Sequence, residues 1–195
     1  MRYRKQCGLL CRLMFIALAL CTAGCLLLDR RNPEPPLQDF GTYTPALSAA
    51  ELMQALEHAV VTRNPILYAQ SFDPLQYRYY PEVEALARYG AVFDGYGYSR
   101  EERFAQGLLS RANLPVDSIS EASFEIVSEQ PSGDKLTVEA DYSIRLGLKL
   151  AVPRSVAAHA VFELVRGSDN GYVIRSWHDT RIGNDPGISE WKAVL

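Results

Sequence analysis

The most regular pattern of hydrophobic and polar positions lies in the C-terminal half of the chain. Every second residue from Leu136 to Val152 is apolar, and the residues between them are mostly polar. This alternation predicts a β-strand with one buried face and one solvated face. Because strands usually have about 3–10 residues, a strand of this length predicts a strongly curved sheet. We expect its bend or bulge at Gly147.

Shorter alternating segments lie on both sides of this strand. Residues 122–126 alternate before it, and residues 156–166 and 172–181 do so after it. Turns rich in Pro, Gly, Ser and Asp separate the segments. Short connections between successive strands favour an antiparallel meander.

The N-terminal half has helical spacing instead. Ser48 and Glu51 form a capping-box pattern, after which apolar residues recur at helical spacing to about Arg63. Pro65 is well placed to open a second, short helix. Residues 99–112 predict a third helix with a capping box of its own.

The region between the second and third helices is less regular. Residues 76–80 predict a brief strand, and residues 81–98 mix helical and extended signals with several glycines. Helices followed by alternating strands predict an α+β domain over residues 48–195. In this fold class the N-terminal helices pack on one face of a strongly curved antiparallel sheet.

The N-terminus has the layout of an export signal. Four basic side chains precede the apolar run Leu13–Leu20, and two small residues stand directly before Cys25. The segment from Leu20 to Cys25 resembles the lipobox of bacterial lipoproteins. This resemblance implies that residues 1–24 are removed as a signal peptide and that Cys25, the new N-terminus, is acylated. Since Leu26 rather than Asp follows, it also implies an outer-membrane location in a bacterium with two membranes.

Two other interpretations of the apolar segment stay open. The run Leu13–Leu28 holds 16 residues, short of the roughly 20 that a membrane-spanning helix needs. The alternatives to a lipoprotein are therefore an uncleaved membrane anchor and a cleaved, unlipidated exported protein.

Residues 25–47 predict a tether between the acylated cysteine and the domain, because they carry several prolines and no apolar periodicity. All four cysteines lie at or before Cys25. A lipoprotein cut at this site would keep one cysteine, the lipidated one, which excludes a disulfide framework, a thiolate metal site and a thiol nucleophile in the domain.

The net charge of the protein bears on which classes of partner it can bind. The signal segment holds four basic and no acidic residues, so its removal from 20 basic and 23 acidic residues leaves a net charge of about −7. A mildly acidic protein is a poor nucleic-acid binder. The expected membrane partner is the lipid bilayer itself, reached through acyl chains on Cys25.

The order of the predicted elements suggests a family for the domain. The order is two helices, a short strand, a third helix and then long antiparallel strands. This order resembles that of the nuclear transport factor 2-like superfamily, which includes ketosteroid isomerases. Three segments also resemble the superfamily, namely Leu56–Ala59, Arg63–Pro65 and the closing strand Tyr172–Asp179. The resemblance implies a cone-shaped domain with a pocket between sheet and helices, and dimerisation through the sheet is frequent in it. The candidate pocket residues are Tyr142, Phe162, Trp177 and Asp179.

The candidate chemistry of this pocket has two interpretations. A ketosteroid-isomerase-like or cyclase-like enzyme needs a carboxylate and an acidic donor in one apolar cavity, and Asp179 and Tyr142 could supply them. A rim ion pair of Asp179 with Arg175 explains the aspartate equally well. A buried carboxylate within hydrogen-bonding reach of a cavity tyrosine would favour the enzyme, whereas a filled cone would favour an interaction or structural role.

Other signals are weaker. Six tyrosines crowd into residues 77–98, and Tyr96 and Tyr98 are candidates for a partner surface, although a half-buried lid over the sheet is the plainer interpretation. The three histidines are scattered without metal-ligand spacing, and no nucleophile elbow is present. We therefore expect no cofactor and no metal. The predicted function is that of an envelope lipoprotein that binds a small apolar ligand or an envelope protein.

Overall fold

The computed structural model describes residues 43–195. The predicted signal peptide, the acylated Cys25 and most of the predicted tether lie outside the described residues, so the lipoprotein prediction is not addressed by the fold. Within residues 43–195, no helix is both long enough and apolar enough to cross a membrane.

Two helices begin the domain, as the spacing predicts. Helix α2 (Ala49–Val61) starts after Ser48, whose hydroxyl accepts from the backbone N–H of Glu51 at 3.2 Å. The Glu51 carboxylate in turn accepts from the N–H of Leu47 at 2.6 Å, which completes a reciprocal cap. Helix α3 (Pro65–Gln70) has proline at its first position and is capped by Asn64.

The segment that mixed helical and extended signals is mainly helical. Strand β1 (Arg78–Tyr80) leads into helix α4 (Val83–Phe93), which is kinked at Tyr89. Helix α5 (Tyr98–Leu108) follows with Gly97 as its N-cap. The second capping box was therefore predicted wrongly: the helix has already begun before Ser99, because the extended backbone that an N-cap needs lies at the glycine.

The sheet has five strands in the order β1-β5-β4-β3-β2. Strands β2 (Ser120–Ser132), β3 (Lys135–Leu146), β4 (Ser155–Arg166) and β5 (Tyr172–Arg181) are antiparallel neighbours, as predicted. Strand β1 pairs parallel with β5, so the sheet is mixed and the prediction of a wholly antiparallel sheet was wrong. Hairpin turns impose antiparallel pairing only between sequence neighbours, and β1 is far from β5 in sequence.

The predicted long strand is also shorter than its pattern. Strand β3 ends at Leu146, and residues 147–154 form a loop. The alternation continues into this loop, where Leu148 is buried. The register shifts lie in β2 and β4 instead, between Ile126 and Ser128 and between Glu163 and Leu164.

Gly147 has a different role from the predicted bend. A Cβ atom at this position would lie 2.7 Å from the side chain of Ser118. The backbone N–H of Gly147 donates to the carbonyl of Ile119. Glycine is therefore needed for close approach of the loop to the residues that precede β2. The strong curvature that the long strand predicted stays a prediction.

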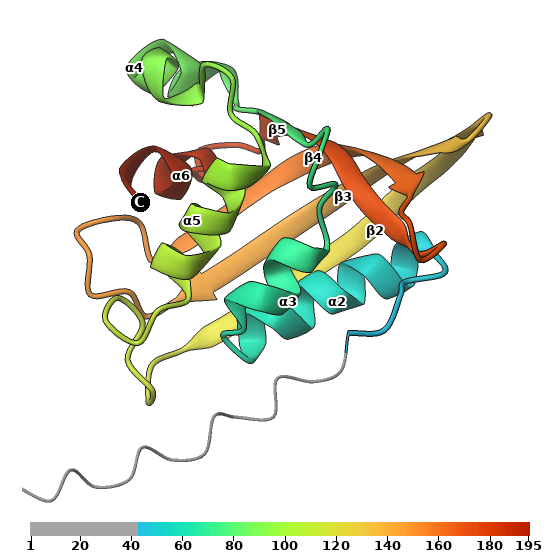
Figure 1. Ribbon diagram of the computed structural model, residues 1–195. Helices are drawn as coiled ribbons and strands as arrows, with labels where there is room; N and C mark the ends of the chain where they lie inside the picture. The colour runs from blue at the N-terminus through green and yellow to red at the C-terminus, as the bar shows by residue number, and fades with distance from the viewer. Residues whose placement is uncertain (1–42) are drawn as a thin grey trace, which may run out of the picture. The chain divides into compact units, whose positions relative to one another are not determined.

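Helices α2 and α3 lie across one face of the sheet, and α5 lies beside them (Figure 1). Helix α2 packs on β2 and touches β5. A last helix, α6 (Ser189–Val194), ends the chain next to α5 (Figure 1). We did not predict α6 from the sequence, although Ile188 and Trp191 are both completely buried.

The two predicted capping boxes can be compared directly. Ser48→Ala should lower the free energy of unfolding by about 1 kcal/mol, because an N-cap acceptor is lost. The matched control is Ser99→Ala, which removes an exposed hydroxyl inside α5 and should change stability by less than about 0.5 kcal/mol. Urea denaturation of both variants measures the difference. Equal losses would mean that Ser99 also acts as a cap.

Candidate functional site

A buried carboxylate lies near the end of strand β5. Asp179 on β5 accepts hydrogen bonds from the hydroxyls of Tyr79 (2.7 Å) and Tyr142 (2.9 Å) and from the indole N–H of Trp177 (2.8 Å). Ser189 on α6 donates a longer hydrogen bond of 3.4 Å. Trp177 and Asp179 are two residues apart on one strand, so both side chains point to the helix-covered face.

Burial raises the pKa of Asp179, and the hydrogen bonds from Tyr79, Trp177 and Tyr142 and the charge of Lys192 oppose that rise. The same burial raises the pKa of Tyr142 well above its usual range, with the Asp179 charge adding to the effect. Both shifts favour the protonated forms of the two groups, and the Tyr142 hydroxyl donates to the carboxyl group.

A second buried carboxylate lies close by. Glu101 on α5 accepts from Tyr68 (2.8 Å) and Tyr77 (3.2 Å) and pairs with the Lys192 ammonium on α6 at 2.5 and 2.7 Å. Both side chains of the ion pair are completely buried. Burial lowers the pKa of Lys192, and the Glu101 charge opposes that shift.

A third carboxylate, Glu82, lies at the start of α4. One of its oxygens accepts from the N–H of Gly187 at 3.4 Å, and the other has no hydrogen-bond partner within residues 43–195. Burial raises the pKa of this carboxyl group. A Cβ on Gly187 would lie 2.9 Å from Glu82 and 3.1 Å from Asp179, so only glycine lets the chain pass between the two acids.

The structure brings the predicted pocket residues together. Tyr142, Trp177 and Asp179 are hydrogen-bonded, and the rings of Phe162 and Trp177 lie 5.0 Å apart. All four are buried. Arg175 does not form the rim ion pair with Asp179 that was considered; it faces Asp73 at 3.5 Å.

The two tyrosines predicted as a partner surface, Tyr96 and Tyr98, differ in their exposure. Tyr96 is only 3% exposed, so its ring offers no external contact in this conformation, while Tyr98 is half-buried. Helix α6 fills the space over the sheet with Ile188 and Trp191. The candidate pocket is therefore occupied by the protein's own side chains.

Sequence reasoning missed most of the polar interior. Neither Glu101 nor Lys192 was predicted to take part in it. One signal was available: the apolar residues Ile188 and Trp191 near the C-terminus have helical spacing. The pairing with Glu101 could not be predicted, because the two residues are 91 positions apart.

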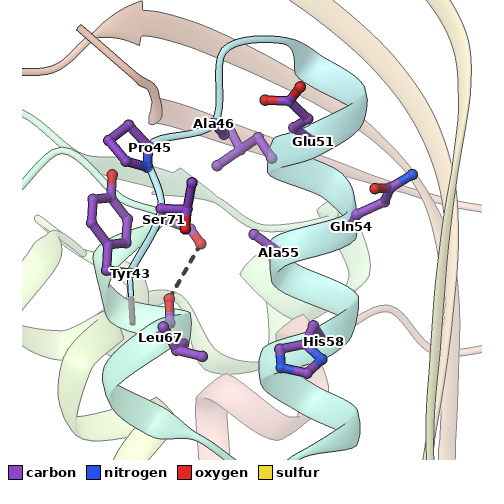
Figure 2. A pocket seen from close by; sticks show the side chains of 11 residues that line it. Tyr43, Pro45, Ala46, Glu51, Gln54, Ala55, His58, Leu67 and Ser71 are labelled. Atoms are coloured by element: carbon purple, nitrogen blue, oxygen red, sulfur yellow. Dashed lines mark hydrogen bonds between the residues drawn. The ribbon is translucent and has the colours of Figure 1, made fainter. Parts of the chain in front are cut away.

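The open concavity lies on the outside of the domain. A groove of about 330 Å³ runs between α2, α3 and the incoming segment Tyr43–Ala46 (Figure 2). Ala55, Leu67 and Pro45 give it an apolar lining. Polar side chains stand around it, contributed by Glu51, Gln54, His58 and Ser71.

Tyr43 closes one side of the groove. Its hydroxyl contacts Asp169, and partial burial together with this carboxylate raises the pKa of Tyr43 to about 12. Ser71 donates to the carbonyl of Leu67 at 3.4 Å, the dashed line in Figure 2. Within residues 43–195, no group of three or more His, Cys, Asp or Glu side chains is arranged to hold a metal ion.

Comparison with known proteins gives the fold. No family model and no curated protein matches the chain. A protein from Novosphingobium aromaticivorans, provisionally described as an aromatic ring hydroxylase, is 16% identical with a TM-score of 0.52 over 81% of this chain and 99% of its own. A conserved protein from Planctomyces limnophilus is 10% identical with a TM-score of 0.52, covering 70% and 94% of the two chains.

An NTF-2-like protein of unknown function from Shewanella oneidensis is 13% identical, with a TM-score of 0.49 over 68% of this chain and 95% of its own. The observed order, helices and then a five-stranded sheet, is the order that the sequence resemblance predicted. The two proteins with TM-scores of 0.52 share the helix-and-sheet fold of this domain. At these identities the likeness concerns the fold alone and not the activity of the domain.

The buried Asp179 gives the stability of the domain a pH dependence. A raised folded-state pKa stabilises the protonated carboxyl, so this contribution is full below the unfolded value of about 3.9 and is lost as pH rises through the folded value. The free energy of unfolding of the wild type relative to Asp179→Asn should therefore fall as pH rises from about 4 toward neutral. Urea denaturation across this range measures it. A difference that grows with pH would contradict the raised pKa.

Proposed function

We propose that this chain is a lipoprotein of the bacterial cell envelope that binds a small apolar ligand in the groove between α2, α3 and Tyr43–Ala46. The anchor is Cys25, the tether follows it, and the NTF2-like domain is a binding module. The observation that carries the binding role is the apolar groove, which is open at the surface (Figure 2).

The size and lining of the groove suit a narrow apolar ligand. Its volume of about 330 Å³ is near the lower end of the roughly 300–1,000 Å³ of small-molecule sites. Leu67 and Ala55 face one another across it (Figure 2). The exposed His58 and Gln54 stand at its polar side, where they could receive the polar end of a fatty acid.

The enzyme alternative has one observation in its favour. Asp179 lies 2.9 Å from the Tyr142 hydroxyl in a buried site, which is the pairing that a ketosteroid-isomerase-like reaction needs. However, Asp179 already accepts from Tyr79, Trp177 and Tyr142, and α6 covers the site. A general base with its lone pairs occupied and no room for substrate is poorly suited to proton abstraction. The binding role is therefore favoured.

The groove predicts a specific effect on ligand binding. Ala55→Phe places a ring in the groove and should weaken the binding of laurate at least tenfold, because the aromatic ring takes the volume of the acyl chain. Ala50→Phe is the matched control: Ala50 is exposed on the same helix and does not line the groove. Isothermal titration calorimetry of laurate into the wild type and both variants measures the affinities.

Two outcomes would count against this site. Equal laurate affinity of the two variants would place the ligand elsewhere, and no binding to the wild type would exclude an acyl ligand. Circular dichroism of each variant shows whether the fold is retained.

The anchor has a separate test. Cells that express the chain and are fed radiolabelled palmitate should label the wild type and not Cys25→Ser, because the thioether and the new N-terminus both require that cysteine. The labelled protein should fractionate with the outer membrane. An unlabelled wild type that keeps its initiator methionine would contradict the lipoprotein assignment.

A further inference from the structure

The ammonium group of Lys192 has the surroundings of a bound ligand. Its side chain is 0% exposed, and its Nζ lies 2.5 and 2.7 Å from the two oxygens of Glu101. The Tyr77 hydroxyl is 3.5 Å away. Lysine is rarely buried completely, so the interior provides an environment that replaces the water around a cation.

Aromatic rings form the rest of that environment. The Nζ atom is 3.9 Å from the centre of the Tyr79 ring and 4.6 Å from that of Trp177. Three more rings lie within 6.0 Å, those of Tyr77, Tyr96 and Phe104. Several π-faces around one cation form an aromatic cage, an arrangement that proteins use to bind ligand ammonium groups. We call these five rings, together with Glu101, the ammonium cage.

The charge around the cage favours a cation. Glu101 is joined by Asp179, which shares Trp177 and Tyr79 with the cage, and Glu82 lies next to Asp179. The negative charges that act on the Lys192 ammonium are therefore those of Glu101 and Asp179. The site would keep its preference for a cation if Lys192 were absent.

A short helix supplies Lys192. Helix α6 has six residues, and its N-cap, Ile188, makes no side-chain cap bond. A groove of about 400 Å³ between α5 and α6 reaches the cage walls at Tyr96 and Phe104. Arg100 and Arg103 line the outer part of this groove. An approaching ligand would therefore meet two guanidinium groups outside and a cation site inside.

We infer that the ammonium cage is a binding site for an ω-amino carboxylate, and that Lys192 occupies it in place of the ligand when α6 is docked. The ligand ammonium would bind Glu101 and the rings, and its carboxylate would lie at Arg100 and Arg103. A primary ammonium fits and a quaternary one does not, because both close contacts to Glu101 are hydrogen bonds that need N–H donors. This site is separate from the groove of the proposed function.

The first experiment uses the full chain with Lys192→Ala, which removes the lysine stem and leaves Trp191 to dock α6. This variant should melt below the wild type. Adding 6-aminohexanoate at about 100 times its Kd should raise the Tm of the variant by roughly 8 °C, because a ligand that binds only the folded state stabilises it by mass action. Thermal unfolding followed by circular dichroism measures the shift.

Three controls separate ammonium recognition from cavity filling. Hexanoate, which lacks the ammonium, should not stabilise Lys192→Ala. Lys192→Met keeps the space filled and should gain no stability from 6-aminohexanoate. The double variant Lys192→Ala/Glu101→Gln should lose the effect, whereas Ala55→Phe added to Lys192→Ala should retain it. If hexanoate works as well as 6-aminohexanoate, Lys192 is part of a structural ion pair only and the inference fails.

A second experiment needs no variant and decides the matter if Lys192→Ala does not fold. Hydrogen exchange of the wild-type full chain is followed with increasing 6-aminohexanoate, and with hexanoate as control. The ligand should displace α6 and raise exchange at residues 189–194 several-fold, while the sheet amides keep their protection. Unchanged exchange of these residues at saturating concentrations of 6-aminohexanoate would overturn the inference.

Discussion

The interior of this domain depends on the buried ion pair between Lys192 and Glu101. Taking two charges out of water costs several kcal/mol per ion, and their attraction offsets this only with close geometry and with the remaining acceptors paired. Both conditions hold, since Glu101 also accepts from Tyr68 and Tyr77 and the ammonium lies against Tyr79 and Trp177. Removing either partner would leave the other charge unpaired in an aromatic interior. Docking of α6 and the position of α5 are therefore linked.

The neighbouring Asp179 cluster joins more distant parts of the chain. Its hydrogen bonds reach Tyr79 on the parallel edge strand β1, Tyr142 on β3 and Ser189 at the start of α6. Since the Tyr142 hydroxyl also accepts from the N–H of Ile188, one carboxyl group holds β1, β3, β5 and α6 in register. The acid–tyrosine pair resembles a catalytic arrangement, and its carboxyl group accepts hydrogen bonds from four side chains of the domain itself.

The proposed binding role depends on a difference between the interior of the domain, which is filled by side chains, and its surface, which has an open groove. The sequence resemblance predicts a pocket in the space between helices and sheet, and here the C-terminal helix takes that space. The surface groove beside α2 and α3 is accessible and has an apolar lining, which supports the proposal of a binding module. Besides Ile188 and Trp191, helix α6 brings Lys192 into the interior. Its ammonium group lies against Glu101 and the rings of Tyr79 and Trp177.

The sequence by itself determined the local elements. Ser48 and Asn64 cap the first helices, and alternation located β2 to β5, because caps and pleat periodicity involve residues close in the chain. It also identified Tyr142, Phe162, Trp177 and Asp179 as one inward-facing group. Only the tertiary structure decided the parallel pairing of β1, the end of β3 at Leu146, and the docking of α6 with Lys192 against Glu101. These features depend on contacts between residues far apart in the chain. A local sequence pattern gives no information on the free energy of such contacts.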